Sequence, residues 1–84
     1  MLERGRVVKS LAGRDEGSLL AVMQVQSGCV ILCDGKERPI DRPKSKNIRH
    51  VEITRALLSE AEITTNRALR KALGRLNAEI NGNT

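Results

Sequence analysis

The chain has 84 residues, carries a formal net charge of +5 at neutral pH, and contains no phenylalanine, tyrosine or tryptophan. This length fits one small domain with at most one appended element. No stretch approaches the roughly 20 apolar residues of a membrane-spanning helix, and the first residues lack the pattern of a signal peptide, so we expect a cytoplasmic protein. The excess of positive charge favours polyanions, chiefly nucleic acid and less strongly an anionic membrane surface.

The first part of the chain predicts two strands around a charged loop. In residues 6–9, neighbouring side chains alternate between the two sides of the backbone, which is typical of a short strand. Residues 19–25 are rich in apolar side chains and predict a second strand. Gly13 and Gly17 give the intervening loop the backbone freedom that a tight turn requires. The charged residues between them should be solvated and accessible to a partner: Arg14, Asp15 and Glu16.

A second hairpin follows directly. Residues 26–28 interrupt the apolar pattern and residues 29–33 resume it, which predicts a strand antiparallel to the preceding one. The dipeptide Asp34-Gly35 is a strong turn signal, compatible with a type I′ turn in which Gly35 is a structural turn residue. We therefore expect a short fourth strand near residues 36–40, with its charged side chains exposed.

The two cysteines are expected to be packing residues. Cys29 and Cys33 are four positions apart, so on one strand they face the same side with Cα atoms roughly 13 Å apart. This separation is too large for a disulfide. The chain has a single histidine, His50, and the spacing does not match a zinc site. We expect no disulfide and no metal, and two small buried side chains in a reducing compartment.

The segment 42–49 contains four basic side chains and no acidic one. Pro43 keeps it from forming a helix and suits an extended loop. Such a loop can be merely solvated, or its side chains can bind phosphate groups. Asn47 could donate a hydrogen bond to a phosphate or cap the turn, and capping is the more common role.

The last strand is predicted around Ile48, Val51 and Ile53. Ile48 and Val51 are out of phase for a regular strand, so we expect either a bulge or a late start. Five short strands within about fifty residues are typical of a small barrel or sandwich.

The chain changes character after Thr54, where an amphipathic helix is predicted. Its apolar residues follow the spacing of one helical face: Leu69, Ala72, Leu73, Leu76 and Ile80. Thr64 or Thr65 can cap the start, and Gly82 lies just beyond the end. Residues 59–62 also have the pattern of a capping box, so one long helix and two shorter ones both fit the sequence.

The opposite face of this helix is basic and carries Arg67, Arg70, Lys71 and Arg75. Gly74 costs the helix about 1 kcal/mol relative to alanine, so the helix should need a surface on which to pack, either the barrel or another copy of the chain. The basic face is then simply solvated, or it extends a nucleic-acid-binding surface. Membrane binding is disfavoured because the apolar face lacks aromatic residues, and we expect no membrane partner.

Two segments carry a resemblance to a known family. Residues 5–22, in which Gly17 would be the hallmark glycine, resemble the KOW motif of small RNA-binding barrels in ribosomal proteins and transcription elongation factors. Residues 42–51 resemble the basic loop and final strand of small bacterial KOW-domain proteins, which are similar to a group of archaeal and eukaryotic large-subunit ribosomal proteins. The likeness covers residues 4–53 and extends, less specifically, to residues 65–73.

The resemblance implies a mainly β fold: a small five-stranded SH3-like barrel over residues 1–54, followed by an amphipathic helical segment over residues 55–84. It also implies that the chain binds RNA, ribosomal RNA in particular, with ribosomal proteins as further candidate partners. In the loop after Gly13, the resemblance implies that Arg14 contacts phosphate, and that Lys9, on the preceding strand, lies close to the same contact.

The charge pattern and the resemblance together predict an RNA-binding surface built from basic loops. Its members are Lys9, Arg14, Arg42, Lys44, Lys46, Arg49 and His50. The expected structural turn residues are Gly13, Gly17 and Gly35. The chain has no aromatic side chain on which a base could stack, so we expect charge-assisted bonds from lysine and arginine to phosphates. Asp15 and Glu16 depart from a purely basic first loop.

RNA binding within the translation machinery is the function class that fits best. The alternative is a protein-interaction module of the transcription or translation machinery, which would use an exposed sheet edge or the amphipathic helix. An enzyme is not expected, because the chain offers one histidine, no carboxylate pair with a supporting partner and no visibly activated cysteine. No cofactor is expected.

Overall fold

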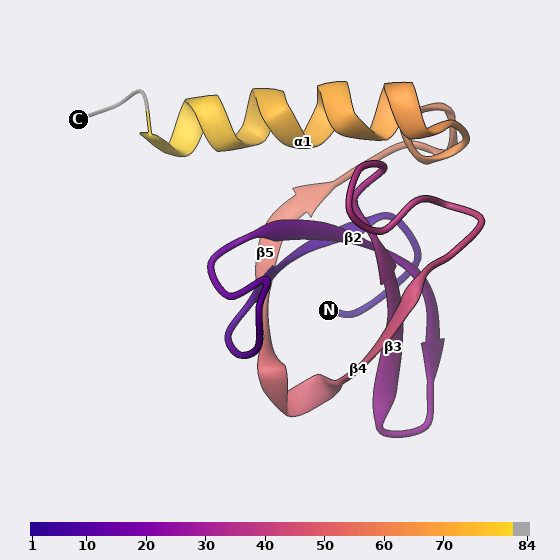
Figure 1. Cartoon of the computed structure of the whole chain (residues 1–84), viewed down its shortest axis with the longest axis vertical. Coiled ribbons are helices and arrows are strands. Elements are labelled where there is room, and N and C mark those ends of the chain that lie inside the picture. The colour runs from indigo at the N-terminus through magenta and orange to yellow at the C-terminus, as the bar shows by residue number, and fades with distance from the viewer. Residues whose placement is uncertain (82–84) are drawn as a thin grey trace.

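The structure, a computed structural model that describes residues 1–81, contains one antiparallel sheet and one long helix (Figure 1). The strands are β1 (Arg6–Ser10), β2 (Leu19–Gln26), β3 (Cys29–Cys33), β4 (Lys44–Asn47) and β5 (Val51–Leu57), in the spatial order β4-β3-β2-β1-β5. The helical elements are two 3-10 turns, η1 (Ile48–His50) and η2 (Glu60–Ile63), and helix α1 (Asn66–Asn81). The predicted mainly β fold with a C-terminal helix is confirmed.

Apolar side chains cover both faces of the sheet, because successive residues of a strand point to opposite sides. In β1, Val7 faces α1 and Val8 faces the other side. The strands curl around the face away from the helix (Figure 1), which is filled by Val8, Leu20, Val22, Val30, Leu32 and Val51. Within residues 1–81 the sheet stays open, since its edge strands β4 and β5 do not pair with each other.

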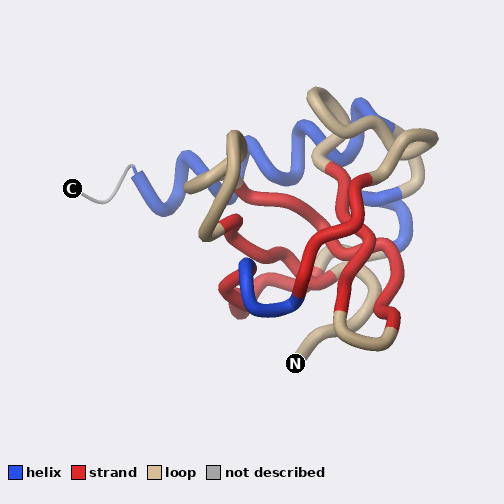
Figure 2. Tube along the Cα trace, turned by 60° about the horizontal axis from the view of Figure 1, so that its bottom comes forward, coloured by secondary structure: helices blue, strands red, loops and turns tan. Residues whose placement is uncertain are grey.

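Helix α1 lies along one face of the sheet (Figure 2). Its buried residues Leu69, Ala72 and Leu73 pack, together with Ile63 of η2, on the apolar face formed by β1, β2 and β3. Burying a leucine or isoleucine side chain contributes roughly 1.5–3 kcal/mol. This packing offsets the weak helix propensity of Gly74.

Two separate elements account for the two capping patterns in the sequence. Glu62 Oε1 accepts hydrogen bonds from the backbone N–H and the hydroxyl of Ser59, and this capping box belongs to the short turn η2. Helix α1 starts independently at Asn66, where Thr65 Oγ1 accepts a 3.1 Å hydrogen bond from the backbone N–H of Ala68. The expected C-cap, Gly82, lies outside the described residues.

The two cysteines both lie on β3 and are free thiols. Cys33 is fully buried against α1, as expected, whereas Cys29 is only half-buried. Burial, together with the nearby charge of Asp34, raises the pKa of the Cys33 thiol to about 11. Cys33 is therefore a neutral packing residue.

The prediction of the fourth strand is wrong. Residues 36–40 form a loop, and the strand is β4, in the basic segment that was expected to be a loop. Asp34 is the physical reason, because its Oδ1 accepts hydrogen bonds of 2.8 Å from the backbone N–H groups of Lys36 and Arg38. These bonds turn the chain back within a wider loop. A type I′ turn needs positive φ at both central residues, and of this pair only Gly35 has it.

A short 3-10 turn explains the broken phase of the last strand. Residues 48–50 form η1, and β5 starts only at Val51. Asn47 caps η1, because its Oδ1 accepts a 2.8 Å hydrogen bond from the backbone N–H of Arg49. Capping is thus the role that the structure gives Asn47, and the late start of the strand is confirmed. The strand then runs to Leu57, past the boundary expected at residue 54.

Gly35 lets the β3–β4 loop approach the start of α1 closely. A Cβ at this position would lie 2.6 Å from the carbonyl oxygen of Asn66, and the backbone φ is +79°. Gly28 has nearly the same φ, +77°, but a Cβ there would meet no atom within 4 Å. An alanine at position 28 would therefore suffer backbone strain alone, whereas an alanine at position 35 would suffer the same strain and a steric clash with the helix.

We expect Gly28→Ala to lower the free energy of unfolding by about 1 to 2 kcal/mol through backbone strain alone. Gly35→Ala should lower it by about 1 to 3 kcal/mol more, because the added methyl group meets the helix backbone. Urea unfolding followed by far-ultraviolet circular dichroism measures both, since the chain has no tryptophan or tyrosine for fluorescence. Equal losses for the two variants would contradict the close contact at Gly35.

Candidate nucleic-acid interface

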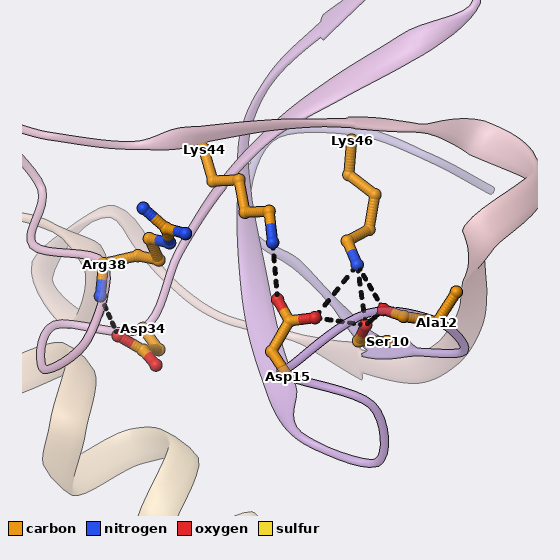
Figure 3. A network of polar contacts seen from close by, with 7 residues as sticks. All are labelled: Ser10, Ala12, Asp15, Asp34, Arg38, Lys44 and Lys46. Atoms are coloured by element: carbon orange, nitrogen blue, oxygen red, sulfur yellow. Dashed lines mark hydrogen bonds and ion pairs between the residues drawn. The ribbon is translucent and has the colours of Figure 1, made fainter.

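The β1–β2 loop is tied to the edge strand β4 by a buried lysine. The ammonium group of Lys46 donates hydrogen bonds to Asp15 Oδ1 (3.0 Å), Ser10 Oγ (2.9 Å) and the carbonyl oxygen of Ala12 (2.7 Å) (Figure 3). These three acceptors match the three donors of an ammonium group. The Lys46 side chain is only 6% exposed. We therefore assign Lys46 a structural role, and not the contact with RNA that the sequence predicts.

This cluster changes the acidity of Asp15. Burial alone would raise the pKa of its carboxyl group, but hydrogen bonds from Lys46 and Ser10 and the charges of both neighbouring lysines lower it to about 2. The second lysine is Lys44, whose ammonium group lies 3.5 Å from Asp15 Oδ2. Asp15 is therefore ionised at neutral pH, and its charge is directed at two lysines.

Three basic side chains from three different segments line one cleft beside this cluster. Arg14 comes from the β1–β2 loop, Arg38 from the β3–β4 loop and Lys44 from β4. Figure 3 shows Arg38 extending from its loop toward Lys44. The cleft has a volume of about 440 Å³ and is also lined by Asp15, Ser18, Leu20, Asp34 and Glu37. We call it the basic cleft.

The charged groups of the basic cleft differ in their availability to a ligand. Within the described chain, the guanidinium groups of Arg14 and Arg38 have no hydrogen-bond or ion-pair partner. Asp15 is balanced by its two lysines, and Asp34 accepts hydrogen bonds from two backbone N–H groups of its own loop. Glu37 is exposed and, among residues 1–81, unpartnered. The cleft thus presents two arginines without a partner among residues 1–81, together with the carboxylates of Asp34 and Glu37.

The other residues expected to contact RNA lie outside the basic cleft. Lys9 is exposed on β1 and stands opposite Glu52 of β5, a position in which opposite charges attract. Arg42 is exposed in the β3–β4 loop, and Arg49 and His50 are exposed on η1. Of the seven residues expected to contact RNA, the structure brings only the Arg14 and Lys44 side chains into one cleft.

Arg38 is the cleft residue that sequence reasoning missed. It was expected on an exposed strand, where its side chain would have had no defined partner. The hydrogen bonds of Asp34 instead fold residues 34–38 into a loop, so that Arg38 lines the cleft. The signal was present in the sequence, since an aspartate can bind backbone N–H groups a few residues ahead and replace a hairpin turn.

The expected turn glycines adopt the left-handed backbone conformation. The φ angles are +87° at Gly13, +88° at Gly17 and +79° at Gly35. In the β1–β2 loop, the backbone N–H of Gly17 donates a 2.8 Å hydrogen bond to the carbonyl oxygen of Ser10. This bond closes the loop and holds Arg14 at the rim of the basic cleft.

A comparison of the chain with protein-family models gave no match, and a comparison with curated protein sequences gave no significant match. Within the described residues, no three histidine, cysteine, aspartate or glutamate side chains gather so that they could hold a metal ion. No helix in residues 1–81 has the length and apolar character needed to cross a membrane. A functional proposal must therefore rest on the geometry and charges of the basic cleft.

The lowered pKa of Asp15 makes the fold sensitive to acid. The folded-state pKa, about 2, lies below the ordinary value of 3.8, so the unfolded chain takes up a proton first as the pH falls. This stabilisation is complete above about pH 4 and is lost as the pH falls through about 2, and it amounts to roughly 2 kcal/mol. We expect Asp15→Asn to be less stable than the wild type at neutral pH and to converge with it near the acid end of this window.

Urea unfolding at a series of pH values measures this difference. Glu16→Gln is the matched control, because Glu16 is an exposed carboxylate in the same loop. Its stability should run parallel to that of the wild type. A constant gap between Asp15→Asn and the wild type across the window would contradict the ion pair.

Proposed function

We propose that this protein binds RNA through its phosphate groups, with the basic cleft as the main contact. The proposal is carried by the convergence of Arg14, Arg38 and Lys44 from three segments on one cleft. The two arginines have no partner among residues 1–81, and an arginine can bind two phosphate oxygens at once. The net charge of +5 adds attraction at longer range.

The residue types favour recognition by charge and shape, with little preference for sequence. No aromatic side chain is present on which a base could stack. Arginine and lysine side chains donate hydrogen bonds and accept none, which suits phosphate oxygens. The resemblance of residues 4–53 to small bacterial KOW-domain proteins supports the same interpretation and favours ribosomal RNA as the ligand.

We expect the double variant Arg14→Gln/Arg38→Gln to weaken both RNA binding and its dependence on salt. Each phosphate contact with a single strand contributes about −0.7 to the slope of log K against log salt concentration, so the loss of two contacts should reduce the slope by about 1.4. Fluorescence anisotropy of a labelled ribosomal RNA fragment, titrated at several salt concentrations, measures the affinity and the slope together.

The matched control is Arg55→Gln/Lys71→Gln, which removes the same charge from exposed positions outside the basic cleft. Its slope should stay close to that of the wild type. Equal losses for both double variants would show that the affinity comes from overall charge and not from the cleft. A wild-type protein with no salt-sensitive affinity for RNA would refute the proposed function.

Glu37 provides a test of opposite sign. Its exposed carboxylate lines the basic cleft and should repel a bound phosphate. Glu37→Gln should tighten RNA binding by about threefold to fivefold at low salt, equivalent to at most about 1 kcal/mol, and the gain should shrink as salt screens the charge. Glu52→Gln makes the same change of charge on β5 and should have a smaller effect. The same gain in both variants would argue against the cleft.

The class of partner can be identified by ribosome co-sedimentation from cell lysate, with and without ribonuclease and across a salt series. Salt-labile, ribonuclease-sensitive migration with the large subunit is the result expected for a ligand of ribosomal RNA. A protein that migrates as a small species and still captures other proteins after ribonuclease treatment would favour the alternative, a protein-interaction module.

A further inference from the structure

Nothing in the structure of residues 1–81 requires a glycine at position 74. It lies in the middle of α1, is exposed, and a Cβ at this position would meet no atom within 4 Å. Its φ is not in the left-handed range, so alanine would fit the backbone. Glycine weakens a helix interior relative to alanine. Position 74 therefore carries a cost in stability that packing inside the protein does not explain.

Gly74 borders a groove between α1 and two loops. The groove has a volume of about 460 Å³ and is lined on α1 by Arg70, Gly74 and Asn77, and on the loops by residues that include Ser18, Asp34, Lys36 and Glu37. Ser18, in the β1–β2 loop, and residues of α1 line opposite parts of this groove. Ser18, Asp34 and Glu37 also line the basic cleft. The groove and the basic cleft therefore share a wall, and one extended ligand can occupy both.

We propose that this groove carries the sugar–phosphate backbone of RNA onward from the basic cleft and across α1 at Gly74. The inference rests on the proposed function, because it extends the path of the same bound strand. A helix position without a side chain lets the backbone of a ligand approach the helix closely. The cost in helix stability at Gly74 is then explained by binding.

The groove is lined by two cations, Lys36 and Arg70, and by two carboxylates, Asp34 and Glu37, and the cations are the groups that can bind a phosphate backbone. Arg70 is held in place, because one guanidinium N–H donates a 3.0 Å hydrogen bond to the carbonyl oxygen of Gly35. A guanidinium group has five N–H donors, so further donors can reach a phosphate. Lys36 is exposed and, in the described part of the chain, has no partner. A strand leaving the basic cleft therefore passes the carboxylates of Asp34 and Glu37 and meets two further cations, Lys36 and Arg70, on its way to Gly74.

Gly74→Ala tests this inference, because it separates stability from binding. The variant should raise the Tm by roughly 3 to 6 °C, since alanine favours the helix and no atom opposes its methyl group. It should at the same time weaken binding to a labelled ribosomal RNA fragment by about threefold, and Gly74→Gln should weaken it by about tenfold, which is about 1.4 kcal/mol. A purely structural role for Gly74 would not combine higher stability with weaker binding.

The matched control is Ala78→Gln, which changes an exposed position one turn further along α1 that does not line the groove. It should bind RNA like the wild type. Unchanged RNA affinity in both Gly74 variants, alongside a loss in Arg14→Gln/Arg38→Gln, would overturn the groove and leave the proposed function intact. Loss of a ribonuclease-resistant protein partner from the Gly74 variants, with RNA affinity unchanged, would assign the groove to a peptide and also overturn the inference. A wild-type protein without RNA affinity would remove both proposals.

Discussion

The side of the protein that carries the basic cleft depends on one ion pair, between Lys46 and Asp15. Lys46 belongs to β4, which pairs only with β3 in the sheet, whereas Asp15 belongs to the loop between β1 and β2. The Lys46 ammonium group joins the two segments by hydrogen bonds of 3.0 Å to Asp15 and 2.9 Å to Ser10. A buried charge that loses its partner is strongly unfavourable, so the two segments keep their positions together. The basic cleft lies between them.

This pair also determines which charges reach the surface. The β1–β2 loop contains Arg14, Asp15 and Glu16 in succession, and by composition it is slightly acidic. Asp15 turns inward, and its negative charge is balanced by the ammonium groups of Lys44 and Lys46. Arg14 lines the cleft and has no partner among residues 1–81. Asp34 is tied to its own β3–β4 loop, because its Oδ1 accepts hydrogen bonds from two backbone N–H groups, and its carboxylate still lines the cleft. The electrostatic character of the cleft therefore differs from that of the sequence segments that form it.

The sequence predicts those elements that contain a run of apolar residues or an apolar helical face. β1, β2 and β3 contain short apolar runs that are buried, and α1 carries an apolar stripe, so local patterns were sufficient. Residues 44–47 are all polar, and β4 forms because it pairs with β3 and because Lys46 reaches Asp15, 31 positions earlier. A local pattern does not contain such distant contacts. For the same reason the sequence placed Arg14 correctly on an accessible loop, but it could not distinguish the buried Lys46 from the neighbouring Lys44 in the cleft.

Helix α1 supports the side of the protein that carries the basic cleft, because the β3–β4 loop is fixed to its first turns. The backbone N–H of Ile40 donates a 2.8 Å hydrogen bond to Asn66 Oδ1, and Arg70 donates to the carbonyl oxygen of Gly35. The same loop carries Lys36 and Arg38, so helix docking and the position of these cations are linked. The core that docks the helix contains no aromatic side chain, and its burial energy comes from small aliphatic residues. A ligand that binds only the docked arrangement stabilises it, and an RNA strand that spans the cleft and the groove would therefore strengthen the packing that forms both.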